Sequence, residues 1–241
     1  MMKDIQSQVD HRRINIKKVG VKTVSYPVTV RDKAKSRQHT IATVNMYVNL
    51  PHRFKGTHMS RFVEILNQYH GAIDLQNFHH ILEEMKVRLE AQASHMEIEF
   101  PYFLSNGKTK ESLNIRQYDC MMCGSVGTDP DLEFRIKVPI SLPINKPLQN
   151  SLPRSLGNWG QAKISVRFST FMWIEDLILE IEKCIEGEIE AVSGTEQSIL
   201  SVETVTRSIG ICLHQLKEVK SYSVQVENLC EDYSTFAMLE S

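Results

Sequence analysis

The sequence lacks any apolar run long enough to cross a bilayer, which takes roughly 20 consecutive apolar residues. Its first residues, MMKDIQSQVDHRR, lack the apolar core that a signal peptide needs. Hydrophobic residues make up 41% of the chain and charged residues 24%, the balance of a soluble globular protein. We therefore expect a cytoplasmic protein that makes no use of a membrane.

An excess of either charge sign is missing as well. The chain carries 28 basic and 29 acidic side chains, for a formal net charge of -1. A protein that holds nucleic acid through bulk electrostatics needs a basic excess, so we expect no nucleic-acid partner. Cysteine is also scarce: five residues, an odd number, suit a reducing compartment rather than a disulfide framework.

A complete metal-binding motif is absent. Cys120 and Cys123 have the spacing of half a zinc site, but no second CxxC or HxxxH pair supplies the other ligands. His79 and His80 fall within a predicted helix, where successive side chains point about 100° apart, so they cannot chelate one ion together. We predict structural or surface roles for these four residues, and no metal site from spacing alone.

The spacing of apolar residues predicts the elements of the first half. Strands are expected over 19–30, 40–50, 95–100 and 113–121, and helices over 62–69 and 78–89. Ser60 is a candidate cap for the first of these helices. In the second strand the apolar side chains alternate, which predicts one buried face made of Ala42, Val44, Met46 and Val48.

A turn-rich run, GSVGTDPD, follows, and after it the same order of elements recurs. Strands are expected over 132–140, 164–168 and 222–226, and helices over 174–185 and 199–216. The sequence therefore predicts an α+β protein built from two copies of a ββααββ plan. The predicted domains are a flexible arm over 1–18, a first module over 19–124, a linker over 125–130 and a second module over 131–241.

Two places could hold a ligand. His58, Ser60 and Arg61 lie in KGTHMSR, directly before a predicted helix, and a helix N-terminus offers free N–H groups and a positive dipole to an anion. Glu203 lies within the last apolar helix pattern and could accept two N–H bonds from a purine or pterin edge. A capped helix start with surface basic residues, and a solvated helix carboxylate, remain the alternatives.

The stretch HTIATVNMYVNLPHRFKGTHMSRFVEIL closely resembles the N-terminal module of type IB GTP cyclohydrolases, whose pattern includes a near-identical KGTHMSRF. The similarity continues through ILEEMKVRLEAQASHMEIEFPYF and resumes at KVPIS, FMWIEDLI, VETVTR and VEN. Residues 19–228 can be aligned with the family in this way, with gaps. A match of that length is far more specific than any single motif.

The resemblance implies a tunnelling fold (T-fold), in which each module is a four-stranded antiparallel sheet with two helices on one face. It implies a homotetramer with active sites at subunit interfaces. The implied reaction converts GTP to 7,8-dihydroneopterin triphosphate, the first step of tetrahydrofolate biosynthesis, with a divalent Zn, Mn or Fe ion activating water. Glu203 matches the family glutamate that anchors the base edge.

The chain departs from the family at its metal ligands. Pro143 and Ile144 stand where the family has the first ligand cysteine, and Trp159 takes the place of a ligand histidine. Cys230 and Tyr233 occupy the positions of a glutamate and a histidine that also reach the metal. Cys230, with Glu196 as a counterpart of a further family glutamate, is the remaining weak metal candidate.

Three functions are compatible with this pattern. The first is a T-fold protein that binds a purine nucleotide or pterin and runs altered chemistry. The second is a non-catalytic partner subunit, a pseudoenzyme that assembles with itself or with a paralogue. The third is a GTP cyclohydrolase with a rebuilt metal site. The sequence assigns no catalytic residue, so whether the chain is an enzyme stays open at this point.

Overall fold

The computed structural model describes residues 15–50, 58–69, 75–105, 115–141, 160–193, 200–229 and 232–241. Within these ranges the elements follow the order ββααββ twice. The strands are β1 (Ile16–Asp32), β2 (Ser36–Leu50), β3 (Ser94–Ser105), β4 (Ile115–Val126), β5 (Asp131–Ile140), β6 (Gly160–Phe168), β7 (Val219–Leu229) and β8 (Ser234–Glu240). The helices are α1 (Met59–Gln68), α2 (Leu75–Arg88), α3 (Ile174–Ser193) and α4 (Val202–Gln215).

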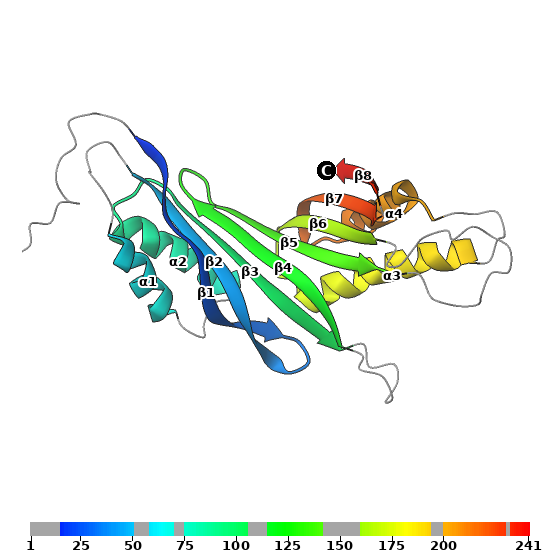
Figure 1. Ribbon diagram of the computed structural model, residues 1–241, viewed down its shortest axis with the longest axis horizontal. Helices are drawn as coiled ribbons and strands as arrows, with labels where there is room; N and C mark the ends of the chain where they lie inside the picture. Colours follow the sequence, from blue (N-terminus) through cyan, green and yellow to red (C-terminus); the bar gives the residue numbers. More distant parts are fainter. Residues whose placement is uncertain are drawn as a thin grey trace, which may run out of the picture. The chain divides into compact units, whose positions relative to one another are not determined.

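The strands are hydrogen-bonded in the order in which the chain makes them, from β1 to β8 (Figure 1). The registers of β1 with β2, β2 with β3, β5 with β6, β6 with β7 and β7 with β8 are all antiparallel. An eight-stranded antiparallel sheet with four helices confirms the predicted α+β class. The finer description as a tandem T-fold stays a prediction.

In the first half, one face of the sheet is apolar and meets the helices. The predicted face of β2 is fully buried, with Ala42, Val44, Met46 and Val48 at most 1% exposed. Alternate residues of β3 continue it, and the apolar stripe of α1, headed by Phe62, packs toward it. Gly124 of β4 lies so close to Phe78 of α2 that any Cβ there would clash with the ring. The amphipathic patterns therefore predicted the correct buried faces.

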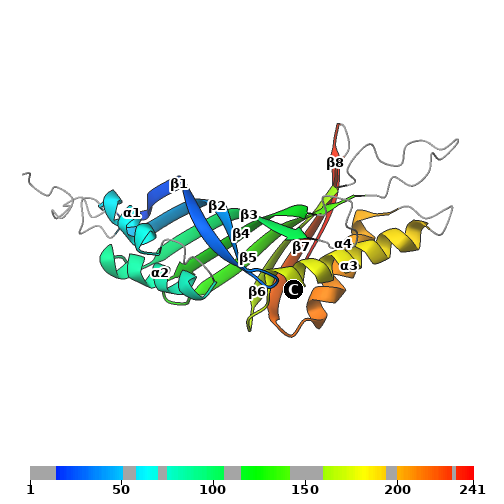
Figure 2. The same ribbon diagram turned by 90° about the horizontal axis from the view of Figure 1, so that it is seen from below.

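In the second half, α3 and α4 lie side by side along the sheet (Figure 2). In α3, which was predicted as a helix over 174–185, the apolar stripe is buried at Leu177, Ile178 and Ile181. Gly210 of α4 faces Leu239 of β8, whose side chain would lie 2.8 Å from an added Cβ. A glycine on α4 thus lets this helix approach the last strand closely.

The chain divides into two compact units, one of Met1–Tyr102 with Cys120–Glu133 and the other of Phe103–Asp119 with Phe134–Ser241. The module boundaries predicted above stay a prediction. The first two residues of the region predicted as linker belong to β4, which runs to Val126, and β5 begins directly after the region, at Asp131. The first strand begins at Ile16, within the predicted arm. None of the described helices is both long and apolar enough to cross a membrane.

Candidate functional site

The start of α1 carries three of the predicted ligand-binding residues. His58 directly precedes the helix, with extended backbone and no capping bond from its side chain. Ser60 is the second helical residue and is exposed, so the prediction that it caps the helix was wrong. The first turn of α1 carries no acidic residue. The positive end of the helix dipole is therefore not neutralised by a carboxylate of its own first turn.

Arg61 has a structural contact that sequence reasoning did not foresee. Its guanidinium Nη1 donates to the carbonyl oxygen of Arg88, the last residue of α2, at 2.9 Å. Carbonyl groups at a helix C-terminus lack intrahelical partners, so this bond satisfies one of them. Arg61 thereby holds the start of α1 against the end of α2. Lys55, Gly56 and Thr57 lie outside the described residues.

Glu203 lies in the first turn of α4 and is exposed to solvent. The side chain of Ser201 caps this helix by accepting from the backbone N–H of Thr204 at 3.2 Å. The pKa of Glu203 is lowered by a hydrogen bond from its own backbone N–H, by the Ser201 side chain and by the charge of Arg207. The carboxylate is thus held ionised and exposed, as an acceptor of N–H groups must be.

His58, Ser60 and Arg61 belong to the first compact unit and Glu203 to the second. The structure therefore brings the first three together at one helix start and places Glu203 at another. Their role in binding a ligand stays a prediction.

The predicted weak metal candidates, Cys230 and Glu196, lie outside the described residues, as does Trp159. Among the residues that the structure describes, no group of three or more His, Cys, Asp or Glu side chains could hold a metal ion. Cys120 is fully buried on β4, and Cys123, three residues further along the same strand, points to the opposite face. These two thiols cannot act as paired ligands.

The face of the sheet opposite the first-half helices carries a polar cluster. Glu97 on β3 accepts hydrogen bonds from Tyr47 Oη at 2.8 Å and from Asn45 Nδ2 at 2.9 Å. Burial alone would raise the pKa of Glu97, but these two bonds and the charges of Lys18 and Lys22 lower it. Burial and the bond to Glu97 raise the pKa of Tyr47 to about 12. The carboxylate is therefore held ionised beside a neutral phenol.

The second half repeats this arrangement. Glu227 on β7 accepts from Gln161 Nε2 at 2.9 Å and from Lys163 Nζ at 2.5 Å, both on β6. The bond from Lys163, followed by that from Gln161, lowers the pKa of Glu227. The registers agree as well, since Asn45 is opposite Glu97 and Gln161 is opposite Glu227.

Sequence reasoning missed both carboxylates because it followed the apolar faces of these strands. The polar residues alternating with those apolar faces were the signal that could have revealed them.

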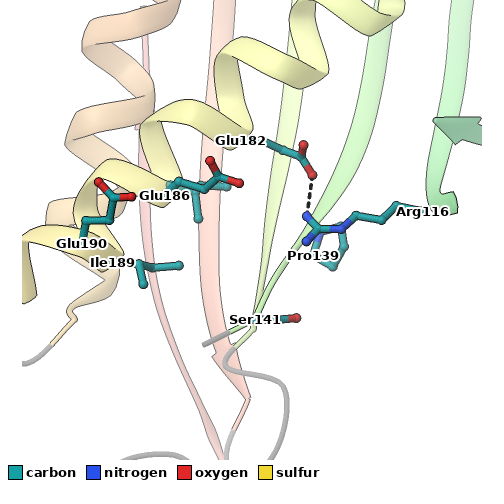
Figure 3. Close-up of a pocket in the computed structure, with 8 residues that line it drawn as sticks. Arg116, Pro139, Ser141, Glu182, Glu186, Ile189 and Glu190 are labelled. Atoms are coloured by element: carbon teal, nitrogen blue, oxygen red, sulfur yellow. Dashed lines mark hydrogen bonds and ion pairs between the residues drawn. The ribbon is translucent and has the colours of Figure 1, made fainter. Parts of the chain in front are cut away.

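A pocket of about 360 Å³ lies beside α3 (Figure 3). Its lining comes from the acidic face of α3, from β4 and from the end of β5: Arg116, Pro139, Ser141, Glu182, Ile185, Glu186, Ile189 and Glu190. Glu182 is buried and accepts from Arg116 Nη1 at 2.8 Å and from the buried Tyr118 Oη at 2.5 Å. This group joins α3 to β4, and none of the predicted ligand-binding residues lines the pocket.

Comparison with known proteins identifies the chain's relatives. The model of the family described as type I GTP cyclohydrolase folE2 matches residues 2–230. The chain is 39% identical to GTP cyclohydrolase FolE2 of Syntrophotalea carbinolica, covering 99% of this chain and 95% of that protein. It is 37% identical to GTP cyclohydrolase FolE2 of Syntrophus aciditrophicus, covering 99% of each.

Solved structures with the same fold are far more distant in sequence. Urate oxidase from Bacillus sp. TB-90 superposes with a TM-score of 0.59 at 9% identity, over 94% of this chain and 99% of that one. Uricase from Arthrobacter globiformis gives a TM-score of 0.51 at 8% identity, over 93% and 92%. At these identities the similarity establishes a common fold and nothing about activity.

The resemblance to GTP cyclohydrolases noted from KGTHMSRF and VETVTR is confirmed at the level of the family, while the IB subtype and the loss of metal ligands stay predictions. The family match and the similarity to its curated members each extend over nearly the whole chain. This chain belongs to the type I GTP cyclohydrolase FolE2 family.

Proposed function

We propose that the chain binds GTP and that GTP cyclohydrolase, the activity for which its relatives are named, is its function in folate biosynthesis. The observation that carries this proposal is 39% identity to a protein named GTP cyclohydrolase FolE2 over 99% of the chain. Similarity of that extent includes both places where a ligand could be held, the start of α1 and the start of α4.

Glu203 is the residue proposed to recognise the base. Its ionised carboxylate is exposed at the start of α4, and a guanine edge presents two adjacent N–H donors to such an acceptor. A charge-assisted, two-point contact is roughly twice as strong as a neutral hydrogen bond and fixes orientation. Glu203 therefore supplies both affinity and selection for the guanine edge.

The start of α1 is proposed to hold an anionic part of the same ligand. This end of the helix has no acidic residue in its first turn and is flanked by His58, Ser60 and Arg61. Backbone N–H groups at a helix start point outward and attract phosphate oxygens. Because Arg61 already donates to the carbonyl of Arg88, its role is to hold this helix start in place. The contacts with the anion are assigned to His58 and Ser60.

We further propose that the two halves are tandem T-fold modules and that the chain assembles as a homotetramer. The repeated ββααββ order supports the tandem description. The repeated carboxylate supports it independently, because Glu97 and Glu227 occupy the same register against the preceding strand and accept from the same two positions on it. Two modules of common origin would carry such a pair. The tetramer rests on the family resemblance.

The metal implied by the family does not fit the donor chemistry of this chain. Proline, isoleucine and tryptophan side chains cannot ligate a divalent ion, and they stand at two of the four resembled ligand positions. Tyr233, at a third, is 67% exposed. The remaining candidates are one thiolate, Cys230, and the carboxylate of Glu196, short of the three protein ligands typical of a catalytic site. We therefore derive no metal-dependent step.

These substitutions favour a second candidate function, which is binding of a purine nucleotide or pterin without the family's ring-opening reaction. Such a protein would run altered chemistry, or would act as a non-catalytic subunit alone or with a paralogue. Both candidates share the base-anchoring role of Glu203, so they differ only in turnover.

The experiment measures binding and turnover on the same preparation. Purified protein is titrated calorimetrically with GTP, guanosine and neopterin, and is assayed for neopterin fluorescence from GTP with Zn, Mn or Fe(II) added. Turnover establishes the cyclohydrolase, whereas binding without turnover establishes the second candidate.

Glu203→Ala should abolish binding in either case, while Glu83→Ala, which removes a half-exposed helix carboxylate elsewhere, should leave it unchanged. Absence of both binding and turnover would overturn both candidates.

A further inference from the structure

Two cysteines outside the proposed binding site meet where α3 packs against α4. Cys184 lies midway along α3 and Cys212 near the end of α4, and both are half-buried. The thiol of Cys212 donates to the carbonyl oxygen of Glu180 on α3 at 3.9 Å. Glu180 is one helical turn before Cys184, and helical side chains lean toward the N-terminus. The Cys184 side chain therefore lies over the same turn that the Cys212 thiol contacts.

The two thiols lie close enough at this turn for each to shift the pKa of the other. The neighbouring Cys212 thiol, together with the charge of Lys183, lowers the pKa of Cys184, although burial and the carboxylates of Glu180 and Glu188 oppose the shift. The Cys184 thiol and burial raise the pKa of Cys212. The pair is thus asymmetric: one thiol is the better source of thiolate, and its neighbour retains its proton.

We propose that Cys184 and Cys212 form an oxidisable dithiol, a modification site at which a small disulfide such as glutathione disulfide introduces a reversible covalent link between α3 and α4. The supporting geometry is the contact of the Cys212 thiol with the Glu180 carbonyl at 3.9 Å, the position of Cys184 on that same turn of α3, and the partial exposure of both thiols at a helix–helix interface. A disulfide requires sulfur atoms about 2 Å apart, and rotation of the two side chains over this turn brings the sulfur atoms together.

The chemistry balances in two exchange steps. The Cys184 thiolate attacks one sulfur of glutathione disulfide, which forms a mixed disulfide and releases a glutathione thiolate that takes up a proton. The Cys212 thiol then loses its proton and attacks the Cys184 sulfur, which forms the protein disulfide and releases the second glutathione. The two protein thiols are oxidised by two electrons, and glutathione disulfide is reduced to two thiols.

The other described cysteines lack this arrangement. Cys120 is fully buried, and Cys123 points to the other face of β4. Since thiolate exchange needs access to the reagent, a buried thiol is a poor target. The Cys184–Cys212 pair is therefore expected to oxidise in preference to these two.

The test uses the full-length protein equilibrated in glutathione buffers that range from reducing to oxidising, then alkylated and digested for mass spectrometry. A peptide linked through Cys184 and Cys212 is expected, and its fraction should rise with the oxidised share of the buffer. The link closes a loop of 28 residues (212 − 184), so the oxidised protein should melt higher than the reduced one, by about 5 °C or more.

Matched variants distinguish the role of Cys184 from that of Cys212 in the exchange reaction. Cys212→Ser should accumulate the mixed disulfide of glutathione at Cys184, because the thiol that resolves it is gone. Cys184→Ser should accumulate far less at Cys212. Cys123→Ser and Cys230→Ser should oxidise as the parent does. Equal alkylation of both thiols in every buffer, or a disulfide that joins Cys230 instead, would overturn the proposal.

Discussion

The buried carboxylate of Glu182 should be the largest single polar contribution to the stability of the second half. Replacing it with alanine leaves the hydroxyl of Tyr118 without its acceptor, in a side chain that is 0% exposed. A hydrogen bond to a charged group contributes about 1.5–3 kcal/mol. Arg116 is 51% exposed at its side chain, so its ion pair adds less than about 1 kcal/mol.

The sum for Glu182→Ala is a loss of about 2–4 kcal/mol, a large share of the roughly 5–15 kcal/mol that stabilises a typical domain. At about 2–4 °C per kcal/mol for a chain of this size, the melting temperature should fall by roughly 4–16 °C. Urea unfolding followed by circular dichroism measures the free energy directly, and Glu182→Gln should lose less, because an amide oxygen can still accept from Tyr118.

The control is Glu186→Ala, which removes an exposed carboxylate one turn further along α3 and should change stability by less than about 0.5 kcal/mol. A double-mutant cycle with Tyr118→Phe should give a coupling of about 1–3 kcal/mol. A loss for Glu182→Ala no larger than the control, or a coupling near zero, would refute the assignment of this energy to the Tyr118 bond.

Three further predictions rest on other contacts. The pKa of Glu97 is lower in the folded protein than its ordinary value near 4.5, so its ionised form stabilises the fold. This contribution to the free energy of unfolding is fully present above pH 4.5 and is lost as the pH falls through the lowered pKa. Unfolding midpoints measured from about pH 7 down to about pH 3 should therefore drop more steeply in the parent than in Glu97→Gln. Gly160→Ala would place a Cβ 1.8 Å from the carbonyl oxygen of Glu227 and should lower the free energy of urea unfolding by about 1–3 kcal/mol. The control is Gly187→Ala, which has open space around it in α3 and should be neutral or stabilising by up to about 1 kcal/mol. Ser201→Ala removes the cap of α4 and should cost about 1 kcal/mol, visible as faster amide hydrogen exchange in the first turn of that helix; unchanged exchange there would contradict the capping role.

Much of the fold was predictable because burial imposes a period on the sequence. The alternation in β2 and the helical stripe of α3 predicted both the elements and their buried faces. Boundaries were less accurate: the turn-rich run from Gly124 predicted a linker over 125–130, but Ser125 and Val126 continue β4 and leave only a short turn. Glycine and serine are compatible with a strand when its pairing partners hold them there.

The candidate site was predictable only in part. Glu203 and the KGTHMSRF residues were identified from motifs, and the structure places Glu203, His58, Ser60 and Arg61 at helix starts. The contact of Arg61 with the carbonyl of Arg88, and the two carboxylates on the sheet, depend on which residues of distant segments lie opposite one another. Register between strands and the packing of helix ends are tertiary properties, so periodicity along one segment cannot reveal them.

The order of the strands has a consequence for how the chain can fold during its synthesis. Each strand neighbours the strand that precedes it in chain order, so no pairing skips over another strand. All four strands and both helices of the first half are complete once Val126 has been made. The first hydrophobic core can therefore close on the ribosome while β5 and the later strands are still untranslated, which shortens the time for which its apolar faces are exposed to other chains.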